Sequence, residues 1–143
     1  MLATIIFAGV LPIPGNATER PLETVYYDDG SYMTVEIITN MARTTWSVTG
    51  SKQYTYYDGN SVSQWKAVLT GTFTYDGSSS NCTSSNVDVT IYDSSWYVIS
   101  QFASKTGNKA NASVTMGEKL VGGTVTRVPV NLSLECDANG NLS

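Results

Sequence analysis

The sequence predicts an all-β protein, and specifically an antiparallel β-sandwich of about eight strands. Apolar and polar residues alternate along several segments, the short strands that they indicate recur roughly every 8 to 14 residues, and no apolar pattern with a helical period persists. The chain also holds 17 serines and 18 threonines, which suit the half-solvated face of a sheet. Its 143 residues fit one domain. A small β-barrel is the alternative fold.

The first 17 residues are predicted to be the remnant of a signal peptide, so that residues 18–143 form the single folded domain. Leu2 to Ile13 is apolar but too short to span a bilayer. Gly15 and Ala17 are small residues suited to a cleavage site after Ala17. No Lys or Arg precedes Arg20, so the basic start of an ordinary signal is missing. The alternative is that this segment is a genuine N-terminal strand.

A tight hairpin is predicted around Asp29 and Gly30, because such a pair suits the positive φ angles of a two-residue loop. This centre would place two sets of side chains on opposite faces. One face would hold Leu22, Thr24, Tyr26, Met33, Val35 and Ile37. The other face would hold Val25, Tyr27, Tyr32, Thr34 and Glu36.

The clearest strand runs from Ser63 to Gly77, and Thr44 to Tyr57 is predicted to be its antiparallel partner. Alternate residues of the clearest strand share a face: Trp65, Ala67, Leu69, Gly71, Phe73 and Tyr75.

The loop between these two strands decides how they pair. A two-residue loop at Asp58-Gly59 would set Val48 opposite Leu69 and Trp46 opposite Gly71. A longer loop that includes Asn60 and Ser61 would slide this pairing.

After Gly77 the alternation does not fit a two-residue loop, so residues 78–81 are predicted to form a longer connection that crosses between sheets. The remaining strands are expected at Asn86–Tyr92, Trp96–Ala103, Lys109–Met116 and Val128–Cys136. In the last of these, alternate residues from Val128 to Cys136 should face the core. Pro129 lacks an N–H group, which favours an edge position.

Cys82 and Cys136 are the only cysteines, and neither has a neighbouring cysteine at metal-ligand spacing. If the protein is exported, a disulfide between them is expected. It would close a loop of about 55 residues, which corresponds to about 4 kcal/mol of stabilisation.

Several classes of function are disfavoured by composition. The chain has no histidine, which removes the commonest general base and metal ligand, so no metal site and no cofactor are predicted. The net charge is −4 and the basic residues are scattered, so nucleic acid is not an expected partner. Many aspartates occupy turn positions, where local hydrogen bonds explain them better than catalysis does. The loop from Asp137 to Asn141 departs from the calcium-loop pattern and is expected to be hairpin-like or frayed.

Aromatic residues give the only positive indication of function. Tyr26, Tyr27 and Tyr32 gather around one predicted turn. The candidate ligand-binding residues gather around another: Tyr54, Tyr56, Tyr57 and Trp65. Exposed rings beside polar side chains are suited to binding a glycan or a protein. The alternative is that these rings only cover the ends of the sandwich.

Two segments, TGTFTYDG at residues 70–77 and CDANGNLS at residues 136–143, carry a resemblance that extends over about residues 25–143. The chain resembles a set of small secreted proteins of unknown function from Gram-positive, often gut-dwelling, bacteria. The resemblance implies export and an all-β domain after a signal peptide. It implies no activity and no catalytic residues.

The sequence therefore predicts a secreted, extracellular, non-catalytic module that binds a glycan or protein through an aromatic surface patch. The second hypothesis is an interaction protein that pairs with another chain by adding a strand at a sheet edge. The third is a carboxylate-based hydrolase, which would need two acids to converge in a cleft. No membrane span is predicted, and the oligomeric state is left open.

Overall fold

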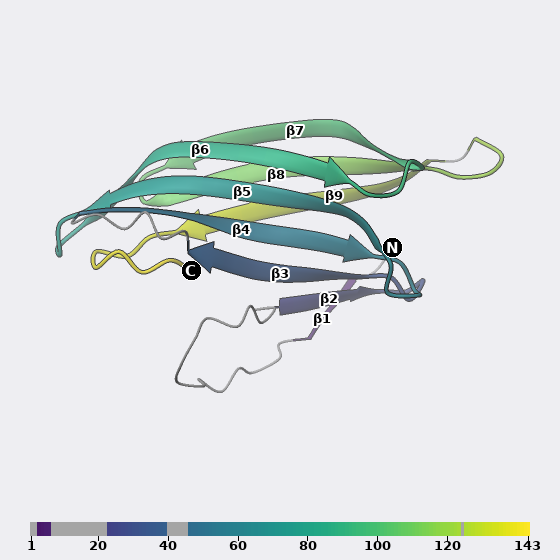
Figure 1. The fold of residues 1–143 in the computed structure, drawn as a ribbon, viewed down its shortest axis with the longest axis horizontal. Helices are drawn as coiled ribbons and strands as arrows, with labels where there is room; N and C mark the ends of the chain where they lie inside the picture. Colours follow the sequence, from purple (N-terminus) through teal and green to yellow (C-terminus); the bar gives the residue numbers. More distant parts are fainter. Residues whose placement is uncertain (1–2, 7–22, 40–45, 124) are drawn as a thin grey trace.

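A computed structural model describes residues 3–6, 23–39, 46–123 and 125–143, and these form two antiparallel sheets packed face to face (Figure 1). The larger sheet has the order β1-β2-β3-β4-β5-β6, and the smaller has the order β7-β8-β9. The predicted sandwich is confirmed, and the sheets do not close into a barrel. The strands are Ala3–Ile6 (β1), Glu23–Tyr27 (β2), Tyr32–Thr39 (β3), Ser47–Tyr57 (β4), Ser63–Tyr75 (β5), Ser80–Ile91 (β6), Trp96–Thr106 (β7), Lys109–Lys119 (β8) and Val125–Glu135 (β9).

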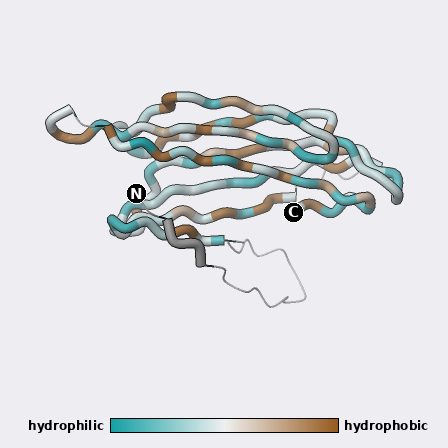
Figure 2. Tube along the Cα trace, turned by 180° about the vertical axis from the view of Figure 1, so that it is seen from behind, coloured by the Kyte–Doolittle hydropathy of each residue, from teal (hydrophilic) through white to brown (hydrophobic). Residues whose placement is uncertain are grey.

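The core lies between the inner faces of the two sheets, where alternate residues of each strand meet. Hydrophilic and hydrophobic segments alternate along the trace (Figure 2). The larger sheet contributes Leu69 and Phe73, and the smaller contributes Met116 and Leu132, all fully buried. Strands such as β9 have one buried face and one exposed face, and burial of the apolar inner faces against each other holds the two sheets together.

The β2–β3 hairpin pairs one residue away from the predicted register. Val25 lies opposite Met33, and Tyr26 lies opposite Tyr32, since the loop holds three residues instead of two. The N–H of Tyr27 donates to the carbonyl oxygen of Ser31 (3.0 Å), which closes that loop. A shift of one residue reverses the faces of β2, so Tyr27 shares the core face with Met33, and Tyr26, which was predicted on that face, points to solvent.

The β4–β5 hairpin uses the longer loop that the sequence left open. Val48 lies opposite Phe73, and Gly50 lies opposite Gly71. The loop runs from Asp58 to Val62, because the N–H of Asp58 donates to the carbonyl oxygen of Val62 (3.0 Å). Trp46 therefore does not face Gly71 in the core; its side chain is 54% exposed at the start of β4.

The connection after β5 is longer than two residues, but it does not cross between the sheets. Asp76 to Ser79 is a tight turn, and β6 pairs directly beside β5. Leu69 pairs with Val87 and Phe73 with Cys82, so four positions along β5 correspond to five along β6. A β-bulge between Thr72 and Phe73 absorbs the extra residue. The bulge is the reason why unbroken alternation could not be fitted to this turn.

The smaller sheet confirms the prediction for the C-terminal strand. Val128, Val130, Leu132, Leu134 and Cys136 are all buried. Pro129 lies on β9, which pairs only with β8 among the described strands and is thus an edge strand, as expected. The last residues fold back on themselves, since Cys136 bridges to Leu142 and the N–H of Ser143 donates to the carbonyl oxygen of Glu135 (3.0 Å). The predicted hairpin-like end is therefore present.

The expected disulfide between Cys82 and Cys136 is absent, which corrects the prediction. Cys82 lies on β6 of the larger sheet, and Cys136 follows β9 of the smaller sheet. Both side chains are buried in the core, where each thiol donates to a carbonyl oxygen close by in the sequence, that of Ser84 for Cys82 (3.3 Å) and that of Asp137 for Cys136 (3.4 Å). The two residues therefore act as small core side chains in this structure.

Within the described residues, the N-terminal part of the chain contributes the strand β1. Ala3 to Ile6 pairs antiparallel with β2 and forms one edge of the larger sheet. The predicted cleavage site at Gly15 to Ala17 lies outside the described residues. The described segments contain no helix that is long and apolar enough to cross a membrane.

Candidate functional site

Two of the four predicted ligand-binding residues belong to the core. Trp65 is 0% exposed, and Tyr56 is 3% exposed. Their rings stack with centroids 5.2 Å apart and an interplanar angle of 6°, and Trp96 of the smaller sheet packs against both. The predicted platform of exposed rings therefore does not form from Trp65 and Tyr56, because the register of β4 and β5 turns both inward.

This buried aromatic cluster has polar contacts at its rim. The hydroxyl of Tyr56 donates to Ser31 Oγ (2.8 Å), and Trp96 Nε1 donates to Gln64 Oε1 (3.3 Å). Burial raises the pKa of Tyr56, while its hydrogen bond to Ser31 acts in the opposite direction. Polar groups that are tied in this way orient the rings instead of recognising a ligand.

The other two predicted residues are half-buried and lie on different faces. Tyr54 packs against the core, where burial raises its pKa. Tyr57 lies on the solvent side of the larger sheet, where it pairs with Tyr32 of β3. Of the four predicted residues, Tyr57 alone joins a surface cluster of aromatic rings.

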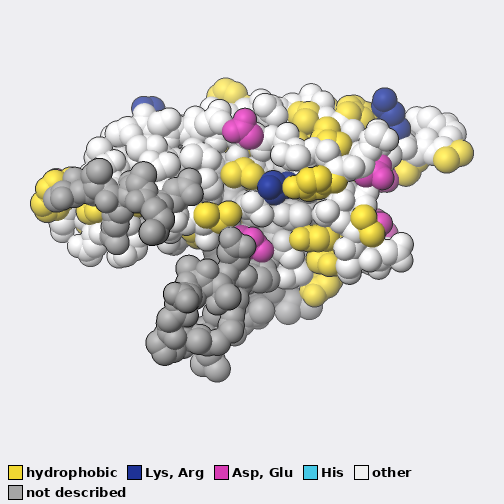
Figure 3. All heavy atoms as spheres, in the orientation of Figure 1, with side chains coloured by type: hydrophobic (Ala, Val, Ile, Leu, Met, Phe, Trp, Pro, Cys, Tyr) yellow, Lys and Arg dark blue, Asp and Glu magenta, His cyan; other side chains and the backbone are white. Residues whose placement is uncertain are grey.

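That cluster consists of Tyr26, Tyr32 and Tyr57, which we call the tyrosine ladder. The three residues are directly opposite one another on β2, β3 and β4. Tyr32 and Tyr57 stack with centroids 4.8 Å apart and an interplanar angle of 13°, and Tyr26 follows at 5.9 Å from Tyr32. Tyr26 is 47% exposed, so the ladder ends in an accessible ring. Figure 3 shows hydrophobic side chains grouped over this end of the larger sheet.

Sequence reasoning found the members of the ladder but grouped them wrongly. It placed Tyr26 and Tyr32 around one turn and Tyr57 around another. It also put Tyr26 and Tyr32 on opposite faces of the hairpin. The pairing of β3 with β4 places Tyr57 beside Tyr32 and so brings the three rings together. No turn signal in the sequence indicated that these two strands pair. Cross-strand aromatic pairs of this kind are a usual source of sheet stability as well as of contact area.

Polar side chains surround the ladder along the same face. The next cross-strand row contains Thr34, Thr55 and Lys66, from β3, β4 and β5. Farther along, Ser51 and Thr70 share a hydroxyl hydrogen bond (2.9 Å), as do Thr49 and Thr72 (3.0 Å). The solvent face of the larger sheet is thus an aromatic strip followed by rows of hydroxyl groups.

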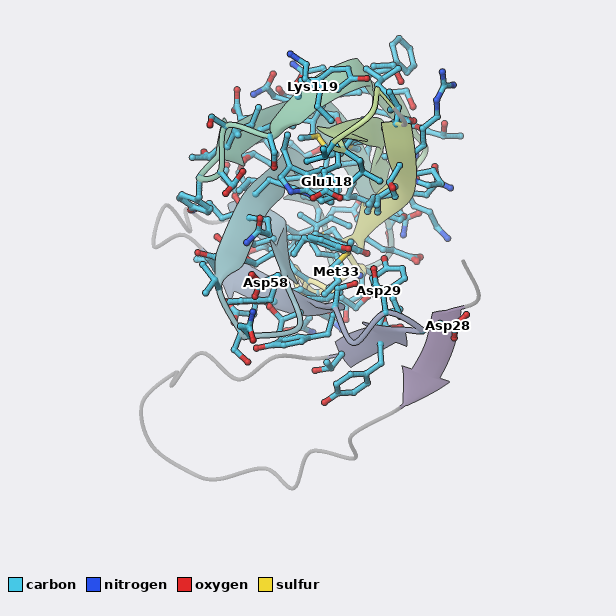
Figure 4. The ribbon with its side chains drawn as sticks, turned by 90° about the vertical axis from the view of Figure 1, so that its right-hand side faces the viewer. Asp28, Asp29, Met33, Asp58, Glu118 and Lys119 are labelled. Atoms are coloured by element: carbon cyan, nitrogen blue, oxygen red, sulfur yellow. The ribbon has the colours of Figure 1, made fainter. Side chains whose placement is uncertain are left out.

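A second feature of the same end of the sandwich is a small acidic pocket. Asp29, Asp58 and Glu118 line a space of about 100 Å³ between the β2–β3 loop, the β4–β5 loop and β8. Figure 4 shows these three carboxylates on separate elements around the end of the sandwich. Burial raises the pKa of Glu118, as do the nearby charges of Asp93 and Asp29. Hydrogen bonds from the Ser31 hydroxyl and N–H lower the pKa of Asp29. The pocket therefore concentrates negative charge.

The turn aspartates are used for local structure, as the sequence indicates. Asp58 Oδ1 accepts from the N–H groups of Asn60 and Val62, both at 2.9 Å. Asp137 Oδ1 accepts from the N–H groups of Asn139 (2.8 Å) and Asn141 (2.9 Å). Equivalent bonds close the turns at Asp29, Asp76 and Asp93. Within the described segments, no group of three or more potential metal-ligating side chains is placed to hold an ion.

Comparison with known proteins adds no further indication of function. The chain matches no family model, no curated protein and no solved structure.

Proposed function

We propose that this protein is an exported, non-catalytic binding module that recognises a glycan through the tyrosine ladder. The observation that carries the proposal is the stacked row of Tyr26, Tyr32 and Tyr57 on the solvent side of the larger sheet. A sugar ring offers a face of C–H groups that packs on an aromatic ring, and its hydroxyls seek hydrogen-bonding partners beside it. The ladder supplies an accessible ring at Tyr26, and the half-buried Thr34 and Lys66 supply polar groups in the adjacent row.

The geometry of the ladder favours an extended ligand over a single small molecule. The rings lie along a line across three neighbouring strands, spaced 4.8 Å and 5.9 Å apart. They form a strip on a sheet face and not a closed cavity. Sites for small molecules are usually concave and enclose most of the ligand. A polysaccharide chain, which presents many equivalent rings, fits a strip of this kind.

The test is retention of the purified protein on insoluble polysaccharides and cell-wall preparations, followed by comparison of two single variants. Tyr26→Ala and Tyr57→Ala should each weaken retention by about threefold to tenfold, the range expected when one aromatic contact is lost. Phe102→Ala is the matched control, because Phe102 is 68% exposed but lies on β7 of the smaller sheet. Its retention should equal that of the unmodified protein.

Two results would contradict the proposal. One is the absence of retention on every polysaccharide and cell-wall preparation in the panel. The other is an equal loss for Phe102→Ala and Tyr26→Ala, which would indicate nonspecific adsorption through any exposed ring. Circular dichroism of each variant establishes that the sheet is intact before the comparison.

A second candidate function is strand addition at the edge of the larger sheet. It is supported by the pairing of Ala3 to Ile6 with β2, because a segment that pairs with β2 within one chain could instead pair with the same edge of another chain. This function requires that the N-terminal segment remains in the mature protein. Mass spectrometry of the secreted protein tests it, and a mature chain that begins at Thr18 would exclude it.

A further inference from the structure

A pocket in the described part of the chain lies at the end of the sandwich opposite the tyrosine ladder. It occupies about 220 Å³ between the start of β4, the end of β5 and the β5–β6 turn. Its walls include Trp46, Tyr75, Asp76, Ser79 and Asn81, and we call it the Trp46 pocket. The ladder lies beside the β2–β3 and β4–β5 loops, so the length of β4 separates the two features.

Trp46 is held in an unusual conformation at this site. Its φ angle is 75°, in the left-handed region that a bulky residue rarely adopts. The N–H of Tyr75 donates to the carbonyl oxygen of Trp46 (3.0 Å), which ties the residue to the end of β5. Backbone strain of this kind persists where surrounding structure enforces it, and it is concentrated at binding sites. The result is a tryptophan that leaves the core and remains 54% exposed.

The ring of Tyr75 completes an aromatic pair with Trp46. The two ring centroids are 6.1 Å apart, with planes inclined at 59°. Tyr75 is itself braced from behind, since a Cβ atom at Gly140 would lie 2.6 Å from the Tyr75 ring, so only glycine fits there. The C-terminal loop thus fixes one of the two rings.

A carboxylate and an amide side chain, those of Asp76 and Asn81, line another part of the pocket. Asp76 accepts hydrogen bonds from the N–H groups of Ser78 (2.9 Å) and Ser79 (2.7 Å), which hold its pKa at about 2. The carboxylate is therefore ionised at neutral pH, and it would repel a uronic acid or another anionic sugar. The side chain of Asn81 is exposed on the neighbouring strand and can both donate and accept hydrogen bonds.

We propose that the Trp46 pocket is a second glycan site, which binds one ring of a neutral sugar. Trp46 and Tyr75 pack against the C–H face of the ring, and Asn81 and Asp76 bond to its hydroxyls. Two aromatic walls and a small number of convergent polar groups are the usual composition of a site for an uncharged polar ligand. The proposal rests on the proposed function only for the class of ligand.

Intrinsic fluorescence can follow this site selectively. Trp65 is 0% exposed and Trp96 is 4% exposed, so among the three tryptophans only Trp46 is open to a soluble quencher such as acrylamide. Neutral hexose and N-acetylhexosamine oligosaccharides are the probes, and oligosaccharides of uronic acids are their anionic counterparts. A neutral probe should shift the Trp46 emission to the blue and reduce its quenching at least twofold. Uronic acid oligosaccharides should leave both unchanged.

Single substitutions then test the polar wall. Asn81→Ala should raise the apparent dissociation constant for the neutral probe by about fivefold, and Asn131→Ala, an exposed asparagine on β9, should leave it unchanged. Failure of every neutral probe to shield Trp46 would overturn the inference. Equal binding by the two asparagine variants would overturn it as well.

The two glycan sites are tested independently. Tyr26→Ala alters the ladder without touching the Trp46 pocket, so it should reduce retention on polysaccharide and leave shielding of Trp46 unchanged. If a neutral probe shields Trp46 but the protein is not retained on polysaccharide, only the proposed function of the ladder is contradicted. If the protein is retained on polysaccharide but no neutral probe shields Trp46, only the second site is contradicted.

Discussion

Gly50 lies directly opposite Gly71 in the β4–β5 ladder, and both residues are buried on the face that meets the core. A Cβ atom at Gly71 would lie 2.7 Å from the Phe73 ring and 2.9 Å from the Ala110 Cβ atom. At Gly50 the nearest atom would belong to the side chain of Leu142. The missing side chains thus make room for the Phe73 ring and for the C-terminal residues.

We expect Gly71→Ala to lower the free energy of unfolding by about 1–3 kcal/mol, the usual cost of overpacking a core. The added methyl group would have to displace the Phe73 ring or the β8 backbone that carries Ala110. Urea denaturation measures the change. Gly59→Ala is the control, since its Cβ atom would meet nothing closer than 3.7 Å. Equal stability of the two variants would contradict the close packing around Gly71.

Trp65→Ala should unfold or strongly destabilise the protein, by about 3–5 kcal/mol. The indole is fully buried, and it contacts Tyr56 of its own sheet and Trp96 of the other sheet. Tyr57→Ala, on the solvent side of the next strand, should cost about 1 kcal/mol, the upper range of a cross-strand pair. Thermal and urea denaturation give the comparison. A Trp65→Ala protein of nearly unchanged stability would show that the ring is not in the core.

Both thiols should be present and shielded. In the native protein, Cys82 and Cys136 should react slowly with a thiol reagent, because both are buried and burial raises the pKa of Cys82. After denaturation without a reductant, two thiols per chain should react. No reactive thiol under those conditions would indicate a disulfide and contradict the structure.

Alkaline pH should destabilise the protein through its buried tyrosines. Burial raises the pKa of Tyr27 to about 12, whereas an unfolded tyrosine has a pKa of about 10. Between these values the unfolded chain releases a proton that the folded chain retains, so the stability contributed by the neutral phenol is lost as the pH rises from 10 to 12. Phenolate absorbance and circular dichroism recorded together measure this loss. Tyr27→Phe should make unfolding in this window less steep, and an unchanged pH dependence for this variant would contradict the role given to Tyr27.

The sequence predicted the fold class because alternation survives along most strands. Every inward-facing residue from Val128 to Cys136 was identified, since that segment has no bulge and one clear periodicity. The edge position of Pro129 followed from its missing N–H group. The turn aspartates were also recognised, because their role depends only on neighbouring backbone groups.

Register was harder to predict, and the candidate site depends on register. One extra loop residue after Tyr27 reverses the faces of Tyr26 and Tyr27, and alternation alone cannot count loop residues. Loop length also determines the position of Trp46. With the Asp58–Val62 loop, Trp46 lies at the exposed start of β4 instead of opposite Gly71, where a two-residue loop would place it. The bulge in β6, where Thr83 is the extra residue opposite Thr72 and Phe73, could not be predicted for the same reason, since it has no composition signal.

The end of the larger sheet next to the β4–β5 loop carries aromatic rings on both faces. Tyr57 belongs to the outer ladder, while the adjacent Tyr56 stacks on Trp65 in the interior. The outer rings are therefore backed by buried aromatic rings of the core. A ligand that lies across them would freeze little protein motion on binding, so the entropic penalty of association would fall mainly on the ligand. A stiff, already extended chain would bind with the smallest loss.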